Sequence, residues 1–287
     1  MGVYAVTGAA SGMGRAVAEK LTAEGHRVIG VDIQETDIVA DLSTAAGRRR
    51  AIDGVLAAAD GRLDGAVLAA GLGPVRDRSR LPVIAAVNYL GVVDLLEGWR
   101  PALAATGAAR VVAFGSNSST TVPLVRNRTI KAFLAGDTER AVRSVRIFGG
   151  QGAPFVYAAS KIAVSRWVRR NAVRPEWAGA GIRVNVIAPG AILTPLLESQ
   201  LATPTEAKAV EAFPVPTGGF GKSEHIADWV SMMLSPSAEF LCGAVLFVDG
   251  GTDAYFRPDD WPRAVPLRGV VGYLRKFLGF ARSRRAG

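Results

Sequence analysis

Short runs of apolar, β-branched residues alternate along the chain with longer stretches in which apolar residues recur at helical spacing. The short runs are VYAVTG, HRVIGVD, DIVADL, DGAVLAAG, RVVAFGS, IRVNVIAPG and AVLFVDGG. Helices are predicted between them over about residues 14–25, 43–59, 82–104, 156–178 and 223–234. Strands this apolar, each followed by a helix, predict a parallel sheet of about seven strands with helices on both faces. We therefore expect a doubly wound α/β fold that binds its ligand beyond the carboxyl ends of the strands.

Two segments depart from this alternation: residues 120–152 and the end of the chain. Residues 120–152 separate a strand from the next helix by more than a loop needs, and they contain a helical pattern of their own. We expect an inserted helix or helix pair there. No linker occurs before about residue 256, so we predict one domain over residues 1–257, including the insertion, and an extension over residues 258–287.

A glycine-rich turn follows the first strand. In TGAASGMG, Gly8, Gly12 and Gly14 precede a helical pattern directly. Glycines allow a tight turn and close approach of the backbone, and the free N–H groups of the helix start attract a pyrophosphate. The position of this turn between strand and helix predicts a dinucleotide site.

Asp32 ends the second strand, 18 residues after Gly14. A carboxylate there accepts hydrogen bonds from the adenosine ribose and repels the extra phosphate of NADP, so NAD is the expected cofactor and NADP the less favoured one. The alternatives are that Asp32 only ends a strand, and that Arg15 beside the turn pairs with a phosphate.

Four polar residues suggest proton transfer. Tyr157 and Lys161 are one helical turn apart in YAASK, Ser116 follows the strand RVVAFGS, and Asn88 interrupts an apolar helix. An asparagine inside a helix is a poor helix former, so it either bends the helix or has a functional reason to be there. The spacing of Tyr157 and Lys161 alone also fits a packed tyrosine and a solvated lysine. Because all four polar residues occur together, we predict Asn88, Ser116, Tyr157 and Lys161 as a candidate catalytic set.

These motifs resemble those of the short-chain dehydrogenase/reductase family, which has a Rossmann-type fold, over about residues 3–257. The matching segments are TGAASGMG, Asp41-Leu42, LAAG, VNYLG, FGS, YAASK and IAPGAILTP. Within the family the chain is most similar to the 3α-hydroxysteroid dehydrogenase/carbonyl reductase branch. That similarity lies in DIVADLSTAAGRRRAI, AGLGP, IAPGAILTPLL, VDGGTDAYFRP and the long segment before YAASK.

The resemblance implies a role for each member of the catalytic set. Tyr157 exchanges the proton, and Lys161 lowers its pKa and holds the nicotinamide ribose. Ser116 orients the substrate oxygen, and Asn88 holds a water that links Lys161 to solvent. The sequence Gly115-Ser116-Asn117-Ser118 leaves Ser118 as an alternative to Ser116.

The resemblance also implies a larger set of cofactor contacts. Pro189 and Gly190 turn the chain under the nicotinamide, and Ile192 and Thr194 bond its carboxamide and the pyrophosphate. The full cofactor set is Gly8, Ser11, Gly12, Met13, Gly14, Asp32, Ile33, Asp41, Leu42, Ala70, Gly71, Asn88, Tyr157, Lys161, Pro189, Gly190, Ile192 and Thr194. The insertion is implied to form a dimer contact, in a homodimer or homotetramer; the alternative is a substrate lid.

Charge gathers at the end of the chain. Of the formal net charge of +9, six charges come from basic residues after residue 267, which leaves +3 for the rest and gives no reason to expect nucleic acid. Residues 267–285 predict a basic amphipathic helix with Val270, Val271, Leu274, Phe277, Leu278 and Ala281 on its apolar side. It either lies weakly on an anionic membrane or a partner, or docks on the protein itself.

Neither the N-terminus nor the two histidines add a further function. The N-terminal sequence lacks a secretion signal, so we expect a cytoplasmic protein, peripheral to the membrane if the tail binds one. The histidines have no ligand cluster nearby, and no metal is expected. Arg48, Arg49 and Arg50 are predicted to form a solvated helix face.

Three functions remain open. The first is an NAD-dependent dehydrogenase of a steroid-like or other lipophilic secondary alcohol. The second is a broad carbonyl reductase or a terpenoid alcohol dehydrogenase. The third is a dinucleotide sensor without turnover, against which the complete proton-transfer set argues.

Overall fold

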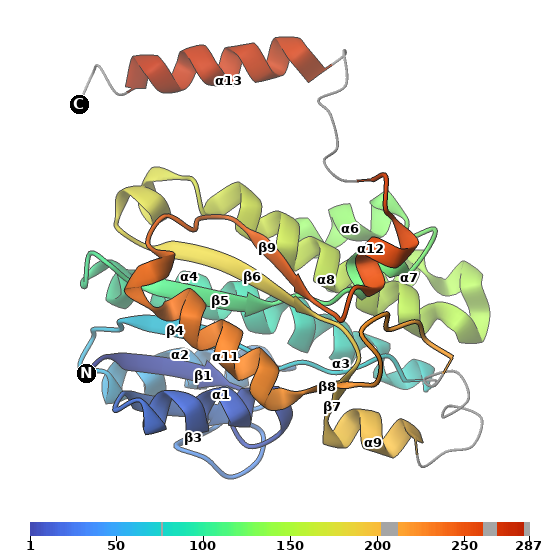
Figure 1. Ribbon diagram of the computed structural model, residues 1–287, viewed down its shortest axis with the longest axis horizontal. Coiled ribbons are helices and arrows are strands. Elements are labelled where there is room, and N and C mark those ends of the chain that lie inside the picture. The colour runs from blue at the N-terminus through green and yellow to red at the C-terminus, as the bar shows by residue number, and fades with distance from the viewer. Residues whose placement is uncertain (76, 202–211, 261–268, 284–287) are drawn as a thin grey trace. The chain divides into compact units, whose positions relative to one another are not determined.

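Seven parallel strands form the centre of the fold in this computed structural model (Figure 1). They are β1 (Val3–Thr7), β2 (Arg27–Asp32), β3 (Ile38–Val39), β4 (Gly65–Leu68), β5 (Arg110–Phe114), β6 (Arg183–Pro189) and β9 (Val245–Val248). Their order is β3-β2-β1-β4-β5-β6-β9, and every neighbouring pair is parallel. The order reverses between β1 and β4, so their carboxyl ends open a crevice of the kind that binds ligands. The predicted sheet is confirmed.

The structure describes residues 1–75, 77–201, 212–260 and 269–283. By its internal contacts the chain divides into a large unit, Met1–Asp253, and a small one, Ala254–Gly287. The predicted division at residue 257 was made on composition, and it stays a prediction.

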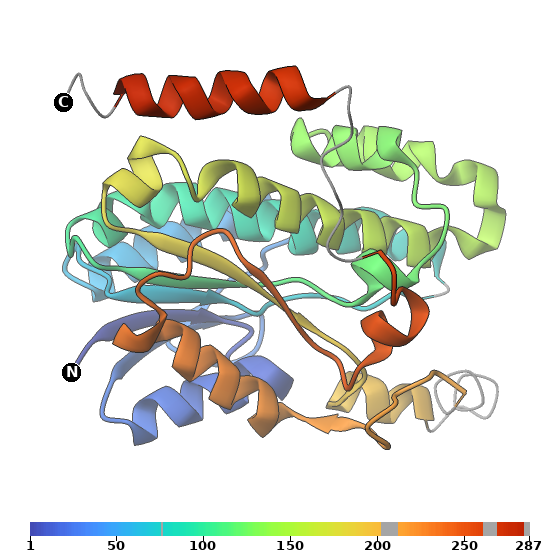
Figure 2. The ribbon, with the colours of Figure 1, turned by 45° about the horizontal axis from the view of Figure 1, so that its top comes forward.

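Helices cover both faces of the sheet (Figures 1 and 2). On one face, α1 (Gly12–Ala23) and α11 (Ser223–Leu234) pack on each other and bury Val17, Leu21 and Val230 against the strands. On the other lie α2 (Ala45–Ala58), α4 (Gly91–Ala104) and α8 (Gly152–Asn171). All four residues of β4 are buried, as the continuous apolar run predicts for a strand covered on both sides.

Short elements complete the large unit. They are η1 (Arg78–Arg80), α3 (Leu81–Ala85), η2 (Ala86–Leu90), α5 (Ser118–Thr121), η3 (Arg146–Gln151), η4 (Pro175–Gly179), β7 (Ile192–Leu193), α9 (Pro195–Leu201), β8 (Gly221–Lys222) and η5 (Pro236–Ala238). A further helix, α12 (Thr252–Phe256), crosses the division between the two units.

The insertion forms a helix pair. It consists of α6 (Asn127–Leu134) and α7 (Thr138–Ser144), which pack on each other, and α6 also packs on α8. Gly136, with φ of 76°, ends α6 in the left-handed region and turns the chain toward α7. Ile130 and Phe133 are almost fully buried, so the pair belongs to the core of the unit. The expectation of a helical insertion is confirmed.

Two predicted helices differ from the observed ones. The stretch predicted at 82–104 is interrupted by one π-helical turn, η2, which contains Asn88. The stretch predicted at 156–178 begins earlier, at Gly152, and ends at Asn171, before a separate turn at Pro175–Gly179. The run Arg78–Ala104 is long and apolar enough to cross a membrane by composition, but 56% of its most apolar window is buried inside the unit.

The expectation that Arg48, Arg49 and Arg50 share a solvated face is wrong for one of the three. Arg48 is 8% exposed and bonds Asp94, whereas Arg49 and Arg50 are exposed. The reason is a contact from 46 residues away, which the local charge pattern of α2 does not contain.

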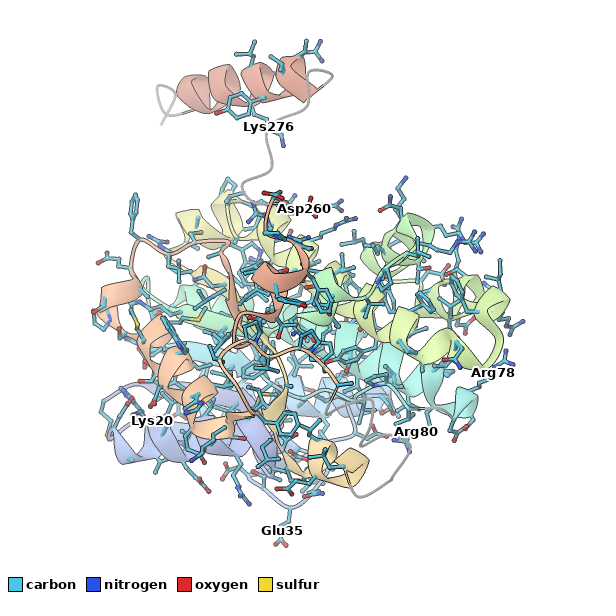
Figure 3. The ribbon with its side chains drawn as sticks, turned by 45° about the vertical axis from the view of Figure 1, so that its right-hand side comes forward. Lys20, Glu35, Arg78, Arg80, Asp260 and Lys276 are labelled. Carbon is cyan, nitrogen blue, oxygen red and sulfur yellow. The ribbon has the colours of Figure 1, made fainter. Side chains whose placement is uncertain are left out.

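The small unit contains the predicted tail helix, α13 (Val270–Ser283). Within it Val271, Tyr273 and Leu274 are more than half exposed, and Lys276 is labelled in Figure 3. The described part of the chain excludes all of residues 261–268 and 284–287. It also excludes the side chains of Phe277, Leu278, Ala281 and Arg282.

Candidate active site

The glycine turn leaves no room for side chains. Gly8 has φ of 72°, and a Cβ atom there would lie 2.9 Å from the backbone nitrogen of Ala70. A Cβ atom on Gly14 would clash with the carbonyl oxygen of Gly8. The start of α1 therefore packs directly on the end of β1, with its free N–H groups at the crevice. Ser11 is the N-cap residue of α1, and its side chain makes no capping bond.

Asp32 is held at the end of β2. One carboxylate oxygen accepts from the Ala10 N–H at 3.0 Å and the other from the Gln34 N–H at 3.1 Å. The carboxylate therefore joins the glycine turn to the loop after β2. Ile33, next in the chain, is 66% exposed.

The segment after β6 lies against the same turn. A Cβ atom on Gly12 would be 3.6 Å from the methyl carbon of Thr194. Pro189 accepts a backbone bond from Asn117 at 2.9 Å, and Gly190 donates one to Val248 at 3.1 Å. The structure thus brings residues about 180 positions apart to one edge of the sheet. The resemblance implies that the two ends of one dinucleotide bind at this edge.

Asn88, Gly71 and Lys161 meet beyond the end of β4. A Cβ atom on Gly71 would lie 3.3 Å from Asn88 Oδ1 and 3.4 Å from Lys161 Nζ. Asn88 is fully buried, and its amide accepts from Leu72 N–H at 2.8 Å and donates to Leu72 C=O at 2.9 Å. Asn88 therefore fixes the loop after β4 beside the Lys161 ammonium, and the π-helical turn η2 places it there.

Lys161 is buried and bonded. Its Nζ donates to the carbonyl oxygen of Phe114 at 3.0 Å, and 4% of the residue is exposed. Burial lowers the pKa of Lys161 to about 8, since the charged form loses its water. Its ammonium lies 6.0 Å from the centre of the Tyr157 ring.

Ser116 is the serine that bonds Tyr157. Burial raises the pKa of the Tyr157 phenol, and the hydrogen bond with the Ser116 side chain opposes that rise. Ser116 Oγ also accepts from the Ser118 N–H at 3.1 Å. The Ser118 hydroxyl is buried and has no hydrogen-bond partner among the described residues. The geometry therefore favours Ser116 over Ser118 as the residue that orients a substrate oxygen.

Sequence comparison identifies the family. A family model described as short chain dehydrogenase matches residues 2–127, and one described as enoyl-(acyl carrier protein) reductase matches residues 140–253. The 3-alpha-hydroxysteroid dehydrogenase/carbonyl reductase of Comamonas testosteroni is 37% identical over 258 residues, which cover 90% of this chain and 99% of that protein. The chain belongs to the short-chain dehydrogenase family. The protein is therefore an oxidoreductase, and the expected resemblance to this branch is confirmed.

Two further short-chain dehydrogenases show how far the similarity extends. The crystal structure of the 3-alpha-hydroxysteroid dehydrogenase of Pseudomonas sp. B-0831, complexed with NADH, is 41% identical and superposes with a TM-score of 0.83. The match covers 90% of this chain and 100% of that one. The cis-4-hydroxycyclohexanecarboxylate dehydrogenase of Sinomonas cyclohexanicum is 32% identical, over 88% of this chain and 96% of the relative.

The residues of this short-chain dehydrogenase fit a dinucleotide. Side chains are excluded at Gly8 and Gly14, and a carboxylate stands at the end of β2. Met13 packs on the core beside the turn, and Ile192 is 6% exposed in β7. Ala70 is held by its N–H, which donates to Thr7 Oγ1 at 3.0 Å. Among the described residues there is no group of three His, Cys, Asp or Glu side chains that could hold a metal ion.

Sequence reasoning missed the groups that position this site. The Phe114 carbonyl holds Lys161, both backbone groups of Leu72 hold Asn88, and Arg48 holds the loop with Leu42. Backbone groups carry no sequence signal, so the first two could not be found from the chain. Arg48 did carry a signal in the sequence. It follows Leu42 by six residues, and the Asp41-Leu42 segment was expected to contact the cofactor.

Proposed function

We propose that this short-chain dehydrogenase uses NAD to interconvert a secondary alcohol and a ketone on a steroid-like or other lipophilic molecule. The observation that supports this most is the gathering of Asn88, Ser116, Tyr157 and Lys161 at the carboxyl ends of the strands, next to a glycine turn and a ribose carboxylate. The hydroxysteroid dehydrogenases among its relatives support the substrate class.

The side chains divide the work of proton transfer. Tyr157 donates its proton to the substrate oxygen in ketone reduction and takes one in alcohol oxidation, while Ser116 orients that oxygen. Burial raises the pKa of Tyr157, so the phenol holds its proton more firmly than a free tyrosine does, and a positive charge near it opposes that rise. Lys161 supplies one such charge, and Asn88 fixes the loop beside it. The nicotinamide, when bound, supplies or accepts the hydride and, when oxidised, adds a second positive charge.

The cofactor preference is tested at Asp32. Its carboxylate disfavours a 2′-phosphate, so wild-type protein should bind NADH at least about tenfold more tightly than NADPH, a difference of about 1.4 kcal/mol. Asp32→Asn keeps an acceptor for the Ala10 N–H but removes the charge, and it should narrow that ratio. Fluorescence titration of both cofactors measures it. An unchanged ratio in the variant would remove the assignment.

The substrate class is tested by comparing alcohols of one chemistry and different size. We expect kcat/KM for a 3α-hydroxysteroid to exceed that for cyclohexanol by at least about a hundredfold, since burial of each additional methylene contributes about 0.8 kcal/mol. A terpenoid alcohol serves as the competing lipophile. Equal values for all three would favour the broad carbonyl reductase instead.

The insertion is proposed as the contact of a homodimer. Two of its apolar residues lie in water, Leu124 at 82% exposed and Ile147 at 68%. Ile147→Asp should halve the mass measured by light scattering, whereas Val173→Asp, at an equally exposed apolar residue outside the insertion, should leave it unchanged. An unchanged mass together with a raised KM for the alcohol would favour the substrate lid.

The tail is proposed as a weak contact with an anionic membrane. The last 20 residues contain six basic and no acidic side chains, and Val271, Tyr273 and Leu274 are exposed apolar residues of α13. We therefore propose a cytoplasmic protein of which a fraction is bound to the membrane. Full-length protein should sediment with phosphatidylserine vesicles at low salt and less with phosphatidylcholine, and Leu274→Glu should abolish this. Equal sedimentation of the variant would contradict the proposal.

A further inference from the structure

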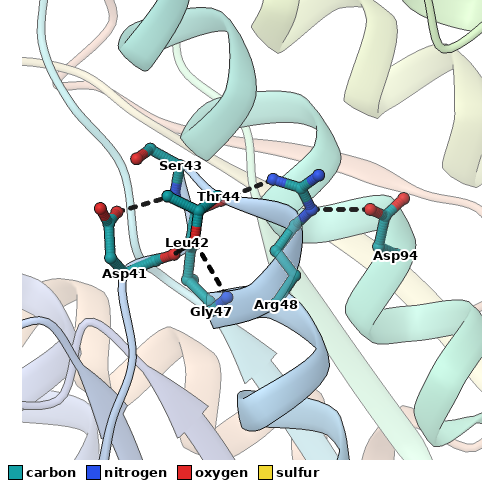
Figure 4. A network of polar contacts seen from close by, with 7 residues as sticks. All are labelled: Asp41, Leu42, Ser43, Thr44, Gly47, Arg48 and Asp94. Carbon is teal, nitrogen blue, oxygen red and sulfur yellow. Dashed lines mark hydrogen bonds and ion pairs between the residues drawn. The ribbon is translucent and has the colours of Figure 1, made fainter.

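Arg48 joins the loop after β3 to helix α4. It is the fourth residue of α2, and its side chain turns back toward the start of that helix (Figure 4). The guanidinium donates from NH1 to the carbonyl oxygen of Leu42 at 3.0 Å and from Nε to Asp94 Oδ2 at 2.7 Å. A planar guanidinium can serve a carbonyl and a carboxylate at once, which a lysine cannot do in the same geometry.

The loop that Arg48 holds starts at Ala40, which is bonded to the end of β2. The Ala40 N–H donates to the backbone oxygen of Asp32 at 2.7 Å, which ties the first residue of the loop to the end of β2. The Leu42 side chain is 5% exposed, while Asp41 is exposed at the surface. The loop therefore has a buried anchor and an outward-facing carboxylate, at the edge of the sheet where the adenine end of the cofactor is expected.

The rest of the loop is fixed by short local bonds. Asp41 Oδ1 accepts from the Ser43 N–H at 2.9 Å, and Thr44 Oγ1 caps α2 by accepting from the Gly47 N–H at 2.9 Å. These bonds set the shape of the loop but join it only to α2. Arg48 provides the link to another helix, and Asp94 in turn keeps the guanidinium aimed at the loop.

We propose that Arg48 is a positioning residue for the adenine end of NAD. It fixes the Leu42-Ser43 peptide, directly after Asp41, through the Leu42 carbonyl, and Asp94 orients the guanidinium without touching the cofactor. This inference rests on the proposed function, because it needs a dinucleotide beside Asp41. Hydrogen-bonding groups for a planar base must be held within a few tenths of an ångström, so a loop released from its anchor binds the base more weakly.

The test separates the adenine end from the rest of the cofactor. NADH is titrated by its fluorescence and then displaced with AMP, in wild-type protein, Arg48→Met, Arg48→Lys and Arg49→Met. Arg48→Met should weaken NADH and AMP by the same factor, about tenfold, as expected for the loss of a hydrogen bond to a charged group. Arg48→Lys should recover part of the loss. Arg49→Met, an exposed neighbour on the same helix, should stay within about twofold of wild type.

Two results would overturn the inference. One is unchanged affinity for both ligands in folded Arg48→Met protein, and the other is a loss for NADH without one for AMP. Should Arg48→Met not fold, Asp94→Ala takes its place, because it removes the carboxylate that aims the guanidinium at the Leu42 carbonyl and should weaken both ligands; equal affinities in Asp94→Ala and wild type would then overturn the inference. Failure of wild-type protein to bind NADH contradicts the proposed function itself, so the two failures are distinguishable.

Discussion

The burial of the Lys161 ammonium leads to a quantitative prediction about how the free energy of unfolding depends on pH. The pKa of this lysine is 10.5 in an unfolded chain and about 8 in the fold, where burial lowers it. That difference corresponds to about 3 kcal/mol by which the fold disfavours the charged form. Below about pH 8 the lysine is charged in both states and the full cost applies. Between about pH 8 and pH 10.5 the unfolded chain binds a proton that the native protein does not, so stability rises with pH.

Replacing Lys161 with methionine isolates this effect. Methionine has a similar length and no charge, so Lys161→Met should remove the cost and its pH dependence together. The lost bond to the Phe114 carbonyl shifts the stability of the variant by the same amount at every pH. We integrate the linkage relation between about pH 7 and pH 9.5. Over that range, the free energy of unfolding of the wild type minus that of the variant should rise by about 2 kcal/mol.

The assay is urea unfolding of both proteins without cofactor, at one protein concentration, across that pH range. Other titrating groups are the same in both proteins, and Tyr157, whose pKa is raised by burial, keeps its proton across this range. The difference between their free energies of unfolding therefore reports on residue 161. A difference that stays flat within about 0.5 kcal/mol, or that falls with pH, would refute the reasoning from burial.

Three further predictions follow from single contacts. Gly14→Ala should weaken NADH binding by more than about tenfold and destabilise the fold by about 2 kcal/mol, because the added methyl group clashes with the Gly8 carbonyl oxygen. The control is Gly179→Ala, where the methyl group has no neighbour closer than 3.6 Å, and it should change neither quantity. Asn88→Ala should cost about 3 kcal/mol in urea unfolding, since it leaves two buried backbone groups unpaired, and a cost below about 1 kcal/mol would contradict the role of the amide. Ser116→Ala should lower kcat about a hundredfold and Ser118→Ala less than about twofold; the reverse order would make Ser118 the catalytic serine.

Local chemistry explains why the fold was predictable. The apolar strand runs, the glycine turn and Asp32 are each signals within a few residues. The strand order was not predicted, because doubly wound parallel sheets occur in more than one order. The helix α11 was predicted at the bounds that the structure has, because a polar start and an apolar period coincide there. The same local reasoning placed Tyr157 and Lys161 on one helix face.

Contacts between distant segments explain what was missed. Arg48 looked solvated because few acids lie near it in the chain, and its partner Asp94 comes from another helix. The break in the stretch 82–104 was invisible for a related reason: the π-helical turn around Asn88 is favoured by two bonds to Leu72, which lies 16 residues away. In the same way, only the folded chain shows that Ser116, and not Ser118, bonds Tyr157.

The central claim is that Tyr157 transfers the proton in a hydride transfer that depends on NAD. The most direct measurement compares wild-type protein with Tyr157→Phe, by the nicotinamide absorbance formed from NAD and a 3α-hydroxysteroid, together with the Kd of each protein for NADH. We predict that the variant loses at least about a thousandfold in kcat while its Kd for NADH stays within about threefold of wild type. Turnover by the variant at a rate near that of wild type would contradict it.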